Sequence, residues 1–273
     1  MVIMLAALFI LLGSAGMTAL DAGQNTARSF SDEDLDRYKE DASSEEPVQN
    51  NTEPEEQVKA DRPLRRYVVP YSGGSRRIII PVTFNGRVTA NMLLDTGAPG
   101  MHISTGLAEA LGLIENKESN LWVTIGGIGG SAPAIFTIMD SIRVGDSEDH
   151  FIPTFISQSV SGEFEGLIGM DFMANYEVRI DTKKRVVIFE EMPQNSDTPA
   201  GHDERWWRTT FHQIRSMRAT LESYRKKIFR AEAYTDRERE LSELIDKQYR
   251  KADEFFNRLS GYASQHSVPN EWR

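Results

Sequence analysis

The chain has 273 residues, of which 40% are hydrophobic and 26% are charged, so it is long enough to bury at least one core. It contains no cysteine, which excludes disulfides, thiolate catalysis and zinc sites built from cysteine. The formal net charge of -10 argues against nucleic acid as a partner, and the acidic residues are spread unevenly along the chain.

Residues 1–20 contain no charged side chain, and a run of this length can span a bilayer. No lysine or arginine precedes the run and an acidic stretch follows it, so neither flank carries basic residues that favour the cytoplasmic side. We therefore expect the rest of the chain to be exported. Two forms are open, a signal peptide cleaved after Gly16 or Ala19 and a retained membrane anchor. A buried N-terminal helix is a weaker alternative, because the run has no polar stripe.

Residues 21–64 are polar and acidic, with almost no β-branched or aromatic side chains. Such a composition cannot bury enough apolar surface to fold, so we predict an acidic disordered linker. The alternative for this segment is an acidic binding tail or an inhibitory pro-segment.

Residues 65–193 have a different character, because short β-rich runs recur at regular intervals with turn signals between them. This pattern predicts an all-β barrel or sandwich. Asn85 and Gly86 suit a type I′ turn, so IIIPVTF and RVTANMLL are predicted to form a hairpin. LWVTI with AIFTIM, and YEVRI with RVVIF, predict two more hairpins. Short helical segments interrupt the strands at STGLAEALGL, which ends at Gly112, and at GLIGMDFMANY.

Residues 205–262 are predicted to form two helices after a proline-containing linker at 194–204, and residues 263–273 form a tail. Apolar side chains there recur every three or four positions, as in a helical hairpin or coiled coil packed on itself or on a partner chain. The first seam contains Trp207, Thr210, Ile214, Met217, Leu221, Tyr224, Ile228 and Ala231, and the second contains Leu241, Ile245, Gln248, Ala252, Phe255, Leu259 and Tyr262.

The link between these two helices, AYTDRERE, reads as a turn in which Thr235 or Asp236 caps the second helix. The first helix is rich in arginine and lysine, from Arg205 to Arg230. That charge suits either a solvated face or an acidic partner, and the chain's own acidic linker is one such partner.

Asp95 follows the predicted strand ANMLL and is either a catalytic carboxylate or a turn residue. Gly97 permits a tight turn two residues later. A glycine-rich hairpin tip is a candidate mobile flap, and it consists of Gly126, Gly127, Ile128, Gly129 and Gly130. A third feature can pack beneath the aspartate loop, namely the residues ahead of the second short helix, Leu167, Ile168 and Gly169.

In this order and at this spacing, LLDTGA, IS with LAEALGL, IGGIGG and GLIGMDFM leading to VRIDTKKRVVIF resemble the retropepsin-like aspartic proteases. The resemblance runs from Arg66 to Met192. It implies a mainly β acid protease barrel, which is followed here by the α-helical hairpin. It also implies that Asp95 is the catalytic aspartate and that the flap covers bound peptide. The resemblance implies a supporting role in the active-site loop for Thr96, Gly97 and Ala98.

Within that family, the Thr96 hydroxyl would hold two active-site loops together and Gly97 would let substrate approach. The chain departs from the family at Met101 and His102, where small or β-branched residues are more usual, and Pro99 and Gly100 alter the loop. These departures bear on substrate preference more than on the chemistry.

Aspartic protease chemistry needs two carboxylates that share a proton, because one must accept a proton from water while the other donates to the peptide carbonyl. The chain offers one Asp-Thr-Gly and one β-rich lobe, so the second carboxylate must come from another copy across a two-fold axis. Asp171 and Asp181 are rivals within the chain, but helix capping explains the first and a hairpin turn explains the second.

The sequence therefore predicts an exported or membrane-tethered aspartic endopeptidase that acts as a homodimer on protein or peptide substrates. Resemblance to bacterial members of the family makes the expected location periplasmic. The hairpin could strengthen the dimer, recruit substrate or dock to an envelope protein. The alternative is a catalytically inactive retropepsin-like module that binds peptides or proteins and whose helices mediate assembly. The histidines are scattered without metal-ligand spacing, so we expect no metal and no cofactor.

Overall fold

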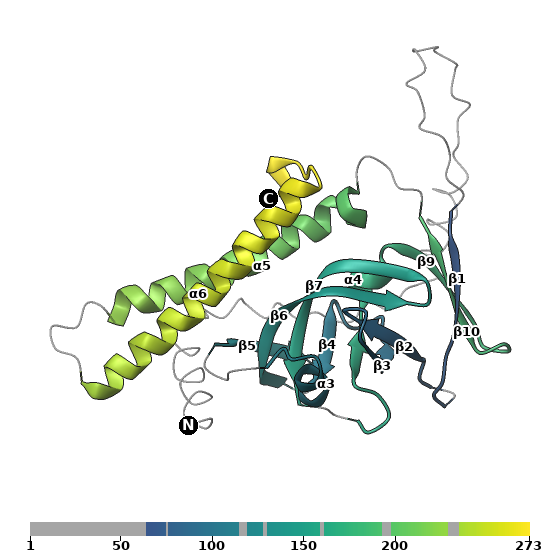
Figure 1. Cartoon of the computed structure of the whole chain (residues 1–273), viewed down its shortest axis with the longest axis horizontal. Coiled ribbons are helices and arrows are strands. Elements are labelled where there is room, and N and C mark those ends of the chain that lie inside the picture. Colours follow the sequence, from purple (N-terminus) through teal and green to yellow (C-terminus); the bar gives the residue numbers. More distant parts are fainter. Residues whose placement is uncertain are drawn as a thin grey trace, which may run out of the picture. The chain divides into compact units, whose positions relative to one another are not determined.

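The computed structural model describes residues 64–74, 76–114, 119–127, 130–158, 161–192, 198–228 and 235–273 (Figure 1). These residues belong to one compact unit, Leu64–Arg273. The predicted signal or anchor and nearly all of the predicted acidic linker lie outside the described residues, as do Ile128 and Gly129 of the predicted flap. No helix within the described ranges has the length and apolar character needed to cross a membrane.

The β-rich region forms two sheets in the described part of the chain (Figure 1). The smaller sheet has the strand order β1–β10–β9, formed by Arg66–Pro70, Val186–Glu191 and Tyr176–Asp181. The larger sheet has the order β2–β3–β8–β4–β7–β6–β5. Its strands in chain order are β2 Ile79–Phe84, β3 Val88–Leu94, β4 Met101–Ser104, β5 Leu121–Gly127, β6 Gly130–Val144, β7 Ser147–Ser157 and β8 Gly166–Ile168.

An additional pairing between β2 and β6 closes the larger sheet into a ring. The ring runs through β2, β3, β8, β4, β7 and β6, and the closure removes the sheet edges that these strands would otherwise expose. Strand β5 stays outside the ring and pairs only with β6 among the described strands. The predicted β barrel is therefore confirmed, with one strand left as an outer edge.

The three predicted hairpins are all present, as β2–β3, β5–β6 and β9–β10. In the first turn Asn85 and Gly86 both have positive φ, 48° and 64°, as a type I′ turn requires, and the Arg87 amide donates to the Phe84 carbonyl at 2.9 Å. In the last turn the Asp181 carboxylate accepts the amides of Lys183 and Lys184 at 3.0 and 2.9 Å.

The two predicted short helices are α3, Thr105–Ala110, and α4, Met170–Met173. The Ser104 hydroxyl caps α3 by accepting the Leu107 amide at 3.0 Å. The helix ends just before Gly112, whose φ is +70°. Phe172 and Met173 of α4 are buried, and the barrel core that they join also includes Ile80, Val82, Phe84, Met92, Ile103, Met139 and Phe189.

The C-terminal region forms two helices, α5 Glu204–Ile228 and α6 Asp236–Gln265, flanked by single 3-10 turns at Pro199–Gly201 and Asn270–Trp272. Thr235 caps α6 in a reciprocal capping box with Glu238. The helices run antiparallel, because Arg218 pairs with Asp253 and Arg225 with Asp246, both at 2.6 Å. The predicted helical hairpin is therefore present.

The hairpin packs on strands of the larger sheet as well as on itself. A second core joins α5 and α6 to β5, β6 and β7, and it contains Leu121, Phe136, Ile138, Phe151, Trp207, Phe211, Ile214, Ala252, Phe255 and Leu259. The rings of Phe136 and Phe255 meet edge to face at 5.5 Å, and those of Phe151 and Tyr262 stack at 4.8 Å. An ion pair joins Arg258 to Asp140 at 2.7 Å.

Candidate active site

Asp95 lies directly after β3, and a parallel neighbour strand fixes its position. Leu93 and Leu94 of β3 pair with Leu167 and Ile168 of β8. The Asp95 amide continues this ladder by donating to the Ile168 carbonyl at 3.0 Å. The predicted residues Leu167 and Ile168 therefore lie beside the aspartate, held to it by main-chain hydrogen bonds.

The aspartate loop, residues 95–100, closes on its own first residue. The Gly97 amide donates to Asp95 Oδ1 at 2.8 Å, and the Ala98 amide donates to the Asp95 carbonyl at 3.2 Å. A Cβ at position 97 would lie 3.2 Å from Asp95 Oδ1, so glycine gives the carboxylate room at this close approach. Asp95 is partly buried, whereas Thr96 and Gly97 are exposed and Ala98 is buried. The loop thus orients one carboxylate near an accessible surface.

Gly169 forms the floor of the aspartate loop. A Cβ there would lie 2.4 Å from the Ala98 carbonyl oxygen and 2.5 Å from that of Gly100, which leaves space for no residue but glycine. The next two amides, of Met170 and Asp171, donate to the Ala98 and Pro99 carbonyls, each at 2.8 Å. The first turn of α4 therefore braces the loop that carries Asp95.

Within the described residues of one subunit, the Thr96 hydroxyl makes no hydrogen bond. Met101 is buried in the barrel core, and His102 stacks on Phe155 with 5.2 Å between ring centroids. Burial lowers the pKa of His102. Met101 and His102 are thus part of the packed sheet beside the loop, whereas Pro99 and Gly100 belong to the loop itself.

The predicted flap residues Gly126, Gly127 and Gly130 lie at the end of the β5–β6 hairpin and are exposed. The last pair described is Gly127 with Gly130. We use the name flap for residues 123–127 with 130–134, which pair with each other.

The rival carboxylates have other surroundings. Asp181 is a turn residue that accepts two backbone amides, as described above. Asp171 lies behind the loop, and a Cβ at Gly100 would be 3.3 Å from its Oδ2. Burial raises the pKa of Asp171 to about 6, an effect that the nearby His202 opposes and that Asp149 reinforces.

Sequence reasoning missed several residues that shape the site. Gly166 packs so tightly that a Cβ would lie 2.0 Å from the His102 carbonyl oxygen, and the repeated glycine in GLIG was the available signal. The Ser104 hydroxyl donates to the Glu165 carboxylate. His202 is buried, stacks on Trp206 at 3.7 Å and has its Nε2 3.5 Å from Asp149 Oδ1. No local pattern indicated these long-range contacts.

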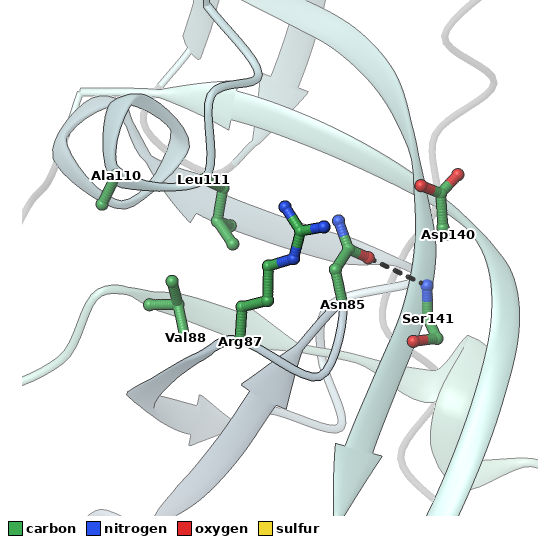
Figure 2. A pocket seen from close by; sticks show the side chains of 7 residues that line it. All are labelled: Asn85, Arg87, Val88, Ala110, Leu111, Asp140 and Ser141. Carbon is green, nitrogen blue, oxygen red and sulfur yellow. Dashed lines mark hydrogen bonds between the residues drawn. The ribbon is translucent and has the colours of Figure 1, made fainter.

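A cavity of about 350 Å³ lies elsewhere on the barrel, and Figure 2 shows the side chains that line it. They are Asn85, Arg87, Val88, Ala110, Leu111, Asp140 and Ser141. The Asn85 side chain accepts the Ser141 amide at 3.1 Å, which ties the β2–β3 turn to β6. None of these residues belongs to the aspartate loop, so this cavity is not the candidate active site. In the part of the chain that the structure describes, no cluster of three His, Asp or Glu side chains could hold a metal ion.

Comparison with known proteins found matches to part of the chain. Residues 80–172 match the family model described as aspartyl protease, and this stretch contains the whole aspartate loop, β8 and the first turn of α4. A retropepsin-like aspartic protease from Rickettsia conorii is among the solved structures that match, at 18% sequence identity and a TM-score of 0.37. That match covers 50% of this chain and 96% of the other. No curated protein matches the chain. Residues 80–172, about a third of the chain, are therefore similar to the aspartyl protease family.

Proposed function

We propose that the chain is an aspartic endopeptidase whose active form is a homodimer, with one Asp95 from each subunit. The observation that carries this proposal is the aspartate loop. Its carboxylate is oriented by the Gly97 amide at 2.8 Å, and its backbone is braced by β8 and α4. Such support holds a reacting group in place before substrate arrives, as catalysis requires.

The chemistry follows from two carboxylates that share one proton. The ionised Asp95 takes a proton from a water molecule, whose oxygen bonds to the carbonyl carbon of the peptide, and the protonated Asp95 of the partner subunit donates to the carbonyl oxygen. Collapse of this tetrahedral intermediate returns a proton to the leaving nitrogen and breaks the C–N bond. All the protons transferred in these steps come from the two Asp95 carboxyl groups and the water molecule.

A second subunit is required because the described residues of one chain do not supply a second suitable carboxylate. Asp181 serves a turn, and Asp171 lies behind the loop near Asp149 and His202. Exposed Thr96, whose hydroxyl has no partner within the described part of one subunit, is available to the matching loop of a second copy. A substrate cleft that forms only between two subunits would also not be present on the surface of a single subunit.

We propose that the enzyme acts outside the cytoplasm, because residues 1–20 contain no charged side chain and are largely apolar. The expected compartment is the periplasm, reached either as a soluble protein after signal cleavage or on an N-terminal anchor. Substrate would be an extended protein segment bound as an added strand. An envelope protein is the proposed partner of the outer face of the helical hairpin.

The test is cleavage of a denatured protein by Asp95→Asn, with Asp181→Asn as the matched control because it changes an aspartate that also opens a turn. We expect wild type and Asp181→Asn to produce fragments between about pH 4 and 7, and Asp95→Asn to produce none while keeping its circular dichroism spectrum and its dimer. Equal cleavage by Asp95→Asn would refute the assignment. Peptide binding without cleavage by wild type would favour the inactive binding module instead.

A further inference from the structure

The flap leaves the barrel at a defined point. Strand β6 pairs with both β5 and β7 at Ile135, which faces Trp122 on one side and Ile156 on the other. Beyond this rung, from the pair Val123 and Ala134 to the tip, β5 and β6 pair only with each other in the described residues. The rung that contains Trp122 is therefore the base of the flap.

Helix α6 holds the outer edge of β5 at this rung through one side chain, Gln248. The Trp122 amide donates to Gln248 Oε1 at 2.7 Å, and Gln248 Nε2 donates to the Asn120 carbonyl at 2.5 Å. One amide group thus satisfies the two backbone groups that a residue of a neighbouring parallel strand would satisfy. Gln248 is only 3% exposed, so water cannot replace it easily.

Helix α6 is itself anchored to the ring, and not only to the flap. Phe255 packs against Phe136 at 5.5 Å and Arg258 pairs with Asp140 at 2.7 Å, and both partners lie on β6 below the flap. The exposed part of the β5–β6 hairpin begins nearer its tip, at Thr124 on β5. The contacts of α6 therefore hold the base of the flap in place and leave the part of the flap near its tip exposed.

We propose that Gln248 is a positioning residue for the flap, which it holds through β5 at the last rung shared with the barrel. This inference rests on the proposed function and gives the helical hairpin a role in substrate binding. If the base of the flap is held less firmly, a smaller fraction of the molecules has the flap closed. The apparent affinity for substrate then falls in proportion to that fraction. A tenfold drop in the closed population would raise KM about tenfold while kcat changes little.

The experiment compares full-length wild type with Gln248→Met, which keeps the length of the side chain and removes both hydrogen bonds. Gln265→Met is the matched control, because Gln265 is the exposed last residue of the same helix. We expect KM for a peptide substrate to rise about tenfold for Gln248→Met alone. Amide hydrogen exchange should accelerate in the flap and remain unchanged in β3. An unchanged KM and unchanged flap exchange in folded Gln248→Met would overturn the inference.

Gln248→Glu provides a conditional rescue. A protonated carboxyl group has one acceptor and one donor, so it can make both of the hydrogen bonds that Gln248 makes, whereas the ionised form can only accept. Flap exchange in this variant should match wild type at about pH 4.5 and match Gln248→Met at about pH 7.5, each compared at equal pH. If flap hydrogen exchange in Gln248→Glu, relative to wild type at the same pH, does not differ between the two pH values, the result counts against the inference. This variant also serves as the test if Gln248→Met does not fold.

Hydrogen exchange also separates this inference from the proposed function. If no form of the protein cleaves peptide but Gln248→Met still loosens the flap, the protease assignment fails and the role of Gln248 stands. If wild type cleaves and Asp95→Asn does not, while Gln248→Met leaves both the flap and KM unchanged, the assignment stands and the role of Gln248 fails.

Discussion

Replacing Gly169 with alanine tests the floor of the aspartate loop most directly. The added Cβ would lie 2.4 Å from the Ala98 carbonyl oxygen and 2.5 Å from the Gly100 carbonyl oxygen, whereas ordinary contacts begin at 3.4 Å. Both obstacles are backbone atoms, so no side-chain rotation relieves them. The loop must move by about 1 Å, which strains the hydrogen bonds from Met170 and Asp171 to the loop.

The expected loss of stability follows from these contacts. Overpacking costs about 1–3 kcal/mol, and each of two weakened hydrogen bonds adds about 0.5–1.5 kcal/mol. We expect Gly169→Ala to lower the free energy of unfolding by about 2–6 kcal/mol in urea titrations. A displacement of about 1 Å at the carboxylate should also reduce kcat/KM about 100-fold.

Gly261→Ala is the matched control, because it lies in α6 and an added Cβ would meet no atom within 4 Å. Alanine in a helix interior should stabilise the protein by about 0.5–1 kcal/mol, the opposite sign. If Gly169→Ala unfolds at the wild-type urea concentration and cleaves substrate at the wild-type rate, the role assigned to the floor is wrong.

Two further predictions concern pH and the shared core. The pKa of Asp171 in the folded state is raised to about 6 from 3.8, so the protonated form is favoured on folding, and stability present below pH 3.8 is lost as pH rises through about 6. Asp171→Asn should remove this loss of about 1–3 kcal/mol, so the urea midpoint should change less between pH 4 and 7.5 than it does in wild type. The same pH dependence of the midpoint in both proteins would contradict this prediction. Phe255→Ala should cost about 3–5 kcal/mol and keep a single unfolding transition, whereas a separate transition of the helices would show that the hairpin and barrel share no cooperative core.

Local chemistry made the hairpins and short helices predictable from the sequence. Asparagine and glycine adopt positive φ more readily than other residues, as Asn85 and Gly86 do, and the Thr235 hydroxyl finds its partner three residues away. Such signals involve residues only a few positions apart, so they can be recognised in the sequence without knowledge of the fold. The same holds for the apolar seams of α5 and α6, whose period identified the helices before any packing was known.

The support around Asp95 depends on contacts between distant residues. Leu93 pairs with Leu167, and no periodicity in the sequence indicates which distant strand β3 will join. Gln248 lies in a predicted apolar seam, yet nothing near it indicates a bond to Trp122. His202 falls in the segment predicted as a linker and is nevertheless 3% exposed, because Trp206 and Asp149 enclose it.

The pairing of β1 with β10 has a consequence for biosynthesis. Arg66 pairs with Glu190, so β1, the first strand of the smaller sheet, must wait until 124 more residues have been made before its neighbour is complete at that position. At about 5–20 residues per second, that delay is about 6–25 s. During this interval the nascent polypeptide lacks a completed small sheet, so that sheet can form only after all the strands of the closed ring have been synthesised.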